Sequence, residues 1–349
     1  MAGLFPPQER DFLLPTEAPL TAKAAERLGR ESAIQTFAPA ARALSIDWQV
    51  QLDGKQIQRW GEALGFRLAQ EQAERTEGLK QGHYPEPPAN APELLVIGMD
   101  GGRYQSRQKD PESKSRWKED KIASFTSYLP GDGKDKPPVP LVSSYVASTQ
   151  ASGSFGPMVK LEALARGSNR AKVVINISDA AGWIDSIEQE QHLSDVRIVD
   201  FYHAAEHVHN ACEAAMGAGS VEARECFVEK RGWLWEGKRS ELVEWMQQEE
   251  VRVKEVSAER AQVLERERGY IQSHAQQMDY PAYRARGWPI GSGGTESAVK
   301  QFNKRVKGTE QFWHPHQLEA ILALRALWLA DDERWHRYWT TRSAYRRAA

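Results

Sequence analysis

The first part of the chain has the apolar periodicity of helices. In residues 21–44 and 55–75, apolar side chains recur every three to four positions, as in amphipathic helices. The second predicted helix carries Lys55, Gln58 and Arg59 near its start. Two helices with a short loop between them form either a helix-turn-helix that reads a DNA groove or an ordinary helical hairpin. The pattern leaves both readings open.

Residues 77–92 are rich in glycine and proline and have no periodicity, so they predict a linker and a domain boundary near residue 90. The pattern then changes to short apolar runs typical of strands, with a helical segment at 155–167. The strand-like runs are 94–100, 121–130, 140–149, 171–179 and 196–200. Three strands, a helix, a strand, a helix or loop and a strand follow the order of a ribonuclease H-like α/β domain with a mixed sheet.

A long helical region follows the last of these strands. From Phe201 to about Arg284 the pattern is almost entirely helical and includes a highly charged run. We therefore predict a helical N-terminal region at 1–90 and a catalytic domain at 91–349 with an all-helical insertion at about 205–285.

Composition limits the class of protein. The chain has 349 residues, 40% of them hydrophobic, which is enough for a substantial core. Its formal net charge is −2, so any nucleic-acid surface must be local. Cys212 and Cys226 are too few for a disulfide framework or zinc ribbon, and the first residues lack a signal-peptide pattern. These features predict a soluble cytoplasmic protein.

Three carboxylates mark the ends of predicted elements far apart in the sequence. Asp100 ends a strand-like run and precedes two glycines, and Asp179 ends another. Glu296 lies in a glycine-rich start to a helix. Each has an ordinary alternative: a hairpin turn for Asp100 and a helix cap for Asp179, for example. Together they are the oxygen ligands that a pair of divalent cations needs for phosphodiester chemistry.

Basic side chains gather after Glu296. Residues 281–349 contain twelve Lys or Arg and six Asp or Glu. The helix that follows Glu296 carries several of these cations, which suit a phosphate backbone or, alternatively, a solvated helix face. The DNA-binding residues predicted from this pattern are Lys300, Lys304, Arg305 and Lys307.

A rival metal motif lies just after the last predicted strand. His203, Glu206 and His207 form the string H-x-x-E-H, the signature of one group of zinc metalloproteases. The same histidines also suit polar contacts along a helix. The protease interpretation gives Asp100, Asp179 and the basic C-terminal region no role.

The motifs MDGG at 99–102, SDAAGWI at 178–184, DFYHAAEH at 200–207 and PIGSGGTES at 289–297 resemble, in this order, insertion-sequence DDE transposases of the ISKra type. The likeness extends over roughly residues 90–340. It implies that Asp100, Asp179 and Glu296 are the catalytic triad.

The same resemblance implies other roles and partners. Asp200 and His203 match a (C/D)-x-x-H motif, which we expect to orient the DNA or support the metal ligands from outside. Trp313 stands at the family's tryptophan position after the basic helix, which implies a DNA-binding residue that stacks on a base or, alternatively, a packing residue. The implied cofactors are two Mg²⁺ or Mn²⁺ ions, and the implied partner is double-stranded DNA, bound by a dimer or larger assembly, with no membrane involved. Ser178 and Ala180 stand where the family usually has glycines around the second aspartate. The N-terminal region is short for the family, so a truncated, inactive DNA-binding remnant is the alternative.

Overall fold

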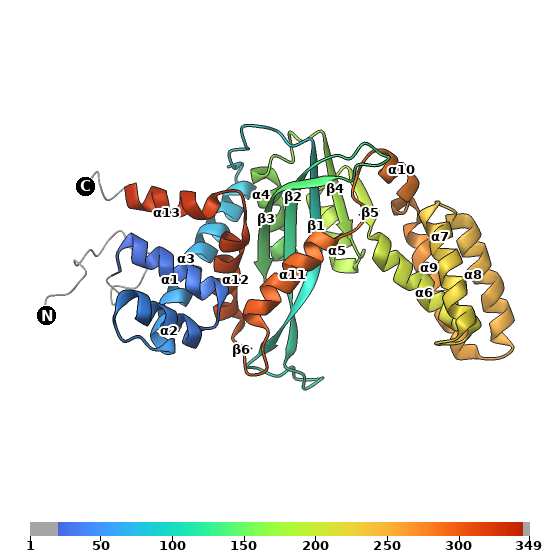
Figure 1. Cartoon of the computed structure of the whole chain (residues 1–349), viewed down its shortest axis with the longest axis horizontal. Coiled ribbons are helices and arrows are strands. Elements are labelled where there is room, and N and C mark those ends of the chain that lie inside the picture. The colour runs from blue at the N-terminus through green and yellow to red at the C-terminus, as the bar shows by residue number, and fades with distance from the viewer. Residues whose placement is uncertain (1–19, 345–349) are drawn as a thin grey trace, which may run out of the picture.

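The computed structural model describes residues 20–344, with side chains up to residue 341. The first 19 residues, on which the signal-peptide prediction rests, lie outside this range. The fold is mixed α/β and elongated, with a central sheet, one helical bundle formed by both ends of the chain and another formed by the insertion (Figure 1).

The centre of the molecule is a mixed sheet in the order β3-β2-β1-β4-β5. The first two pairings are antiparallel, and β1, β4 and β5 run parallel. This is the order of a ribonuclease H-like sheet, so the predicted fold class is confirmed. The strands are β1 (Leu94–Ser106), β2 (Trp117–Leu129), β3 (Val139–Ser148), β4 (Val173–Ser178) and β5 (Val196–Val199).

Strand β1 is longer than predicted. It continues six residues beyond Asp100 to Ser106, because β2 pairs with it as far as Gln105 and the short β6 (Phe312–Trp313) joins its far end. The parallel pairing with β4 stops at Gly98. Asp100 therefore lies inside a strand, at the point where one of its neighbours ends, and the prediction that Asp100 ends the strand is wrong.

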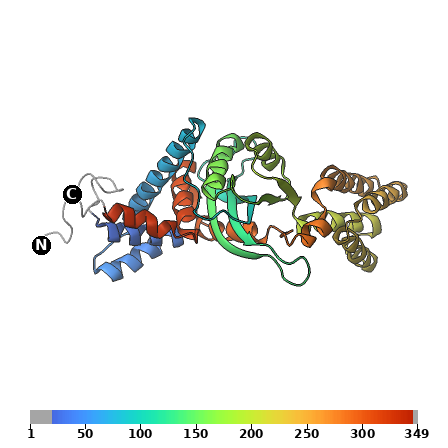
Figure 2. The same ribbon diagram turned by 90° about the horizontal axis from the view of Figure 1, so that it is seen from above.

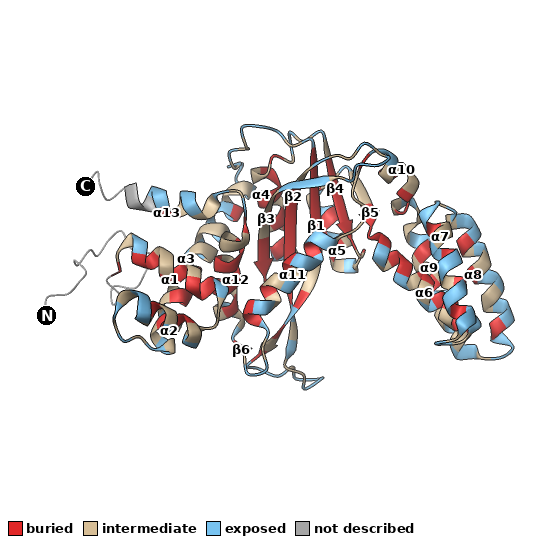
Figure 3. Ribbon diagram, in the orientation of Figure 1, coloured by how far each residue is buried: buried red, intermediate tan, exposed pale blue. Residues whose placement is uncertain are grey.

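Helices cover both faces of the sheet (Figure 2). On one face α4 (Ser152–Ala165) and α5 (Gly182–Gln191) pack on side chains such as Ile97 and Phe125. On the other, α11 (Gly293–Val306) and α12 (Pro315–Leu329) cover Tyr104, Ile122 and their neighbours. The central strands are accordingly buried on both sides (Figure 3).

The N-terminal helices pack against the C-terminal ones. The predicted helix at 21–44 is two helices, because the chain leaves the helical conformation at Gln35 and a new helix begins after Thr36. Two arginines of the C-terminal helices bind the end of the first helix. Arg305 Nε of α11 donates to the Ser32 carbonyl at 2.7 Å, and an Arg325 NH of α12 donates to the Ala33 carbonyl at 2.7 Å. The bundle contains α1 (Ala22–Ile34), α2 (Phe37–Trp48), α3 (Gly54–Lys80), α12 and α13 (Arg334–Ala344).

After β5 the chain forms a helical bundle of its own before it returns to the sheet in α11 (Figure 1). Its core is continuous with the sheet through Phe201, Tyr280 and the apolar face of β4. Across the described residues, no helix is long and apolar enough to cross a membrane. The helices are α6 (Phe201–Met216), α7 (Val221–Trp235), α8 (Arg239–Lys254), α9 (Ala258–His274), a short 3-10 turn (Ala275–Gln277) and α10 (Tyr280–Ala285).

Candidate active site

Asp100 is partly buried, as is Asp179, whereas Glu296 is exposed. It lies on the pleat of β1 that faces α11, and its Oδ1 accepts the Gly101 N–H at 2.6 Å. Burial and, to a smaller extent, the negative charges of Asp179, Glu296 and Glu119 outweigh the hydrogen bond from Gly101 and raise its pKa to about 6. Strand register places Asp179 beside it, because Gly98 of β1 pairs with Ile177 of the parallel β4, and Asp100 and Asp179 each follow two residues later.

Asp179 follows the last residue of β4. Its Oδ1 accepts the Ala181 N–H at 3.0 Å, and the next residue, Ala180, has a left-handed backbone with φ of 59°. The Tyr270 hydroxyl of α9 donates to the Asp179 carbonyl at 2.9 Å. The insertion therefore holds the backbone of the second predicted carboxylate in place.

Glu296 comes from the first turn of α11, which crosses close above β1. Gly98 makes this approach possible, since a Cβ at Gly98 would lie 1.9 Å from Thr295 Oγ1. Thr295 is buried there and its hydroxyl lies 2.8 Å from Ser124 Oγ. The neighbouring Glu296 is half exposed and forms an ion pair with Lys300 at 3.2 Å.

The donor set fits divalent cations chemically, because hard carboxylate oxygens are the ligands that Mg²⁺ and Mn²⁺ prefer. Like charges crowd Asp100, and a bound cation would offset that repulsion. In the arrangement observed, no three His, Cys, Asp or Glu side chains within residues 20–341 are close enough to share an ion. Ligation by all three would require the exposed Glu296 side chain to leave Lys300.

Asp200 has a structural role that connects two parts of the site. It is 2% exposed, and its Oδ1 caps α6 by accepting the N–H groups of Tyr202 at 2.6 Å and His203 at 2.9 Å. Its other oxygen accepts the Ser292 N–H, one residue before α11 begins. Asp200 thus fixes the start of the helix that carries Glu296. Its carboxylate oxygens are both engaged with backbone N–H groups.

The two histidines of the H-x-x-E-H string form a chain of polar contacts within the helical insertion. The Nε2 atoms of His203 and His207 lie 3.3 Å apart, and His207 Nδ1 lies 2.5 Å from the buried Glu267 carboxylate. Glu206 is 75% exposed at its side chain and approaches the opposite nitrogen of His203, 3.6 Å away. Glu206 therefore does not lie beside the two facing Nε2 atoms, where a zinc protease would need its general base. Tyr270 stacks on His207 with ring centroids 3.6 Å apart.

The predicted DNA-binding residues divide into two groups. Lys300, Lys304 and Lys307 form an exposed stripe along α11. Arg305 is 1% exposed and faces Phe37 and the N-terminal bundle, and burial lowers its pKa to about 9. Trp313 is buried and donates from Nε1 to the Val306 carbonyl at 2.8 Å. Arg305 and Trp313 are packing residues, and their prediction as DNA contacts is corrected.

Two acidic residues of β2 near the site were missed from the sequence. Glu119 lies beside Gly101, whose missing Cβ leaves room for the carboxylate, and it raises the pKa of Asp100. Asp120 is fully buried opposite Gly102, and burial raises its pKa to about 6. Their sequence, WKEDK, looks like an exposed loop, and only the pairing of β2 with β1 places them here.

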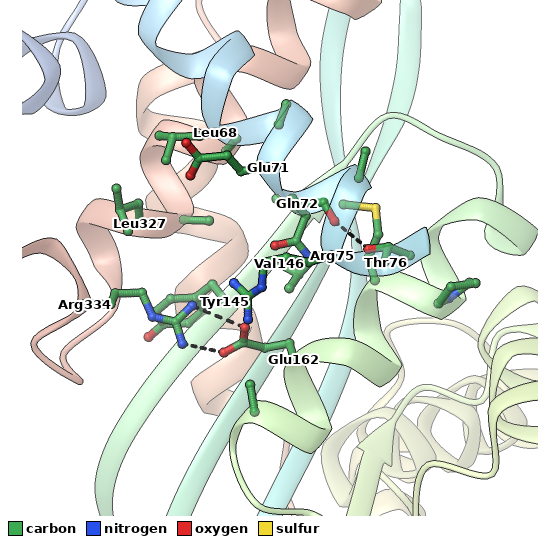
Figure 4. Close-up of a pocket in the computed structure, with 18 of the residues that line it drawn as sticks. Leu68, Glu71, Gln72, Arg75, Thr76, Tyr145, Val146, Glu162, Leu327 and Arg334 are labelled. Atoms are coloured by element: carbon green, nitrogen blue, oxygen red, sulfur yellow. Dashed lines mark hydrogen bonds and ion pairs between the residues drawn. The ribbon is translucent and has the colours of Figure 1, made fainter. Parts of the chain in front are cut away.

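A cavity of about 730 Å³ lies away from the carboxylates, between α3, β3, α4, α12 and α13 (Figure 4). Charged groups on its wall are paired with each other: Arg334 binds Glu162 at 2.5 Å and Asp332 at 2.8 Å. These pairs are made within the wall itself, and we assign the cavity no function.

Comparisons with known proteins place the chain only loosely. No protein-family model and no curated protein matches its sequence. A solved structure titled "Drosophila P element transposase strand transfer complex" matches with a TM-score of 0.41 and 9% sequence identity, over 91% of this chain and 94% of that chain. Overlap at this level is too loose to indicate what this chain does.

Proposed function

We propose that this protein is a DDE transposase that cleaves and joins DNA at the ends of an insertion sequence, most similar to the ISKra type. One observation carries the proposal: Gly98, two residues before Asp100, pairs with Ile177, two residues before Asp179, and lies against Thr295, the neighbour of Glu296. A strand, a strand end and a helix each supply one carboxylate. This arrangement suits phosphodiester chemistry assisted by divalent cations.

In this proposal the three carboxylates would hold two Mg²⁺ or Mn²⁺ ions, and the chemistry such ions would supply is neutralisation of the charge on the attacked phosphate. The chain's own residues position these ligands. Gly98 lets α11 approach the sheet, Asp200 fixes the start of α11, and Tyr270 holds the backbone at Asp179. The exposed lysines of α11 would lie along a DNA phosphate backbone beside the carboxylates.

The test is nicking of DNA that carries the inverted repeats flanking the coding sequence, measured with Mg²⁺ and in EDTA. We expect Asp100→Asn to abolish nicking and to leave DNA binding intact. Glu206→Gln is the matched control, because it removes an acid from the H-x-x-E-H string and leaves the three carboxylates unchanged. Nicking that survives Asp100→Asn would refute the catalytic assignment.

The same experiment separates the alternatives. An inactive remnant would bind end DNA and show no metal-dependent cleavage with all three carboxylates present. A zinc protease would contain bound zinc on elemental analysis and lose it in His203→Ala. The position of Glu206 on the far side of the His203 ring argues against the protease.

A further inference from the structure

The far end of β1 carries an exposed row of side chains across three strands. Gln105 pairs with Trp117 of β2 on one side and with Phe312 of β6 on the other. Residues paired in this way project from the same face of a sheet. Trp117 is 44% exposed and Phe312 is 36% exposed, although both are large aromatic side chains. We call these three residues the aromatic platform.

A cation lies over each ring of the aromatic platform. Lys307 Nζ lies 5.4 Å from the centre of the Trp117 ring, and the Arg116 guanidinium lies 5.3 Å from that of Phe312. The platform's position is fixed, because the Gln105 side chain donates to the Gly308 carbonyl at 2.8 Å and the Arg107 N–H donates to the Trp313 carbonyl at 2.9 Å. The rings therefore sit on a rigid three-stranded support.

The surrounding hairpin has a local excess of positive charge. Residues 101–121 contain seven Lys or Arg and four Asp or Glu, and one of the acids, Asp120, is fully buried. A second acid, Asp110, is engaged in the turn, where its carboxylate accepts N–H groups from Glu112 and Ser113. The charge on this surface therefore suits a polyanion.

We propose that the aromatic platform binds unpaired bases of a DNA strand that continues from the catalytic site. Exposed aromatic side chains on neighbouring strands, about 10 Å apart over two strand spacings, can each stack on one base, as on the sheets of single-strand-binding domains. Paired bases inside a duplex cannot present their faces in this way. The inference rests on the proposed function, since it takes the bound polymer to be the DNA that is cleaved.

The distance along β1 indicates how much of a DNA strand would lie between the carboxylates and the platform. Gln105 is five residues from Asp100, which is about 17 Å along an extended strand, and because successive side chains alternate it projects from the opposite face of the sheet. Between the end of β4 pairing at Gly98 and the start of β6 pairing at Gln105, this side of β1 has no strand partner among the described residues. In our proposal, a DNA strand leaving the carboxylates passes through this notch to the other face of the sheet and reaches the platform within several nucleotides.

The test compares two probes by fluorescence anisotropy with the full chain in EDTA, where metal-dependent cleavage cannot occur. One probe is a blunt duplex of about 30 bp, and the other is the same duplex with a single-stranded extension of about ten nucleotides. We expect Trp117→Ala to weaken binding of the extended probe about 5- to 150-fold and to leave the blunt duplex unchanged. Trp117→Phe should restore most of the affinity, because it keeps a stacking ring.

Two control variants test whether the effect is specific to the aromatic platform. Tyr84→Ala removes an aromatic residue that is 71% exposed in the linker, and Lys254→Ala removes an exposed cation on α8 in the insertion. Both should bind the two probes as the wild type does. Far-ultraviolet circular dichroism checks that each variant is folded.

The outcomes are distinguishable. If Trp117→Ala and Tyr84→Ala bind both probes equally well, or if Trp117→Ala weakens both probes to the same extent, the inference is wrong. Loss of a wild-type dimer in Trp117→Ala, measured by sedimentation, with unchanged DNA affinity would instead make the platform a contact between copies. If the wild type binds the extended probe tightly but never nicks DNA, the proposed function is contradicted, whereas the role of the aromatic platform in binding unpaired bases is not.

Discussion

Gly98 sets the distance between the helix that carries Glu296 and the strand that carries Asp100. In Gly98→Ala the new Cβ would meet Thr295 Oγ1 at 1.9 Å, whereas ordinary contact begins near 3.4 Å. The start of α11 would have to move by about 1.5 Å, the difference between these two distances. We expect such overpacking to cost about 1–3 kcal/mol of unfolding free energy.

The same movement should impair catalysis more than stability. A displacement of about 1 Å at a catalytic group can cost about 100-fold in rate. We therefore expect Gly98→Ala to reduce metal-dependent nicking by roughly that factor at temperatures where the variant is folded. Urea unfolding followed by circular dichroism gives the stability, and single-turnover nicking gives the rate.

A second substitution makes the reasoning refutable. Thr295→Ala alone removes the 2.8 Å contact with Ser124 and should cost about 1 kcal/mol. In Gly98→Ala with Thr295→Ala the closest clash is gone, so the double variant should lose less stability than the sum of the two single losses. Gly153→Ala, where the added Cβ has no atom within 4 Å, is the control for adding a methyl group to a glycine. Additivity within about 0.5 kcal/mol would show that the contact does not hold α11 in place.

Three further outcomes follow from the site. Because burial raises the pKa of Asp100 to about 6, its ionisation opposes folding above that pH. Asp100→Asn should therefore raise the unfolding free energy by on the order of 1 kcal/mol in mildly alkaline buffer without metal, and the gain should vanish below the unfolded pKa of 3.8. Arg305→Met should cost about 1–3 kcal/mol in urea unfolding and leave the salt dependence of DNA binding unchanged, whereas Lys304→Met should do the reverse and reduce the log-log salt slope by about 0.9. Asp200→Ala should cost about 1–2 kcal/mol and lower the nicking rate by displacing Glu296; an unaltered rate would contradict its positioning role.

The element order could be predicted from the sequence because periodicity is local. Runs such as 171–179 alternate or cluster their apolar residues as strands do, and the region from Phe201 onward repeats as helices do. Glycines around the carboxylates and the separation of the acids along the chain were also readable. The strand order, however, is set by the pairing of the strands, which the order of elements along the chain does not fix.

Pairing between distant segments decided what the local pattern could not. The length of β1 depends on its pairing with β2 on one side and β6 on the other. From the sequence alone, Asp100 could therefore not be recognised as an interior strand residue. Arg305 has the same sequence signature as its neighbouring lysines. It is buried because the N-terminal helices, far away in sequence, pack onto that side of α11.

What the sequence determined by itself is therefore the set of elements and the candidate carboxylates, because helix and strand preferences and turn residues act over a few positions. The tertiary structure alone decided which cations face solvent, which acids crowd Asp100 and where the aromatic platform is exposed. Burial and charge proximity depend on contacts between segments that are separate in the sequence, and these contacts leave no periodic trace in the chain.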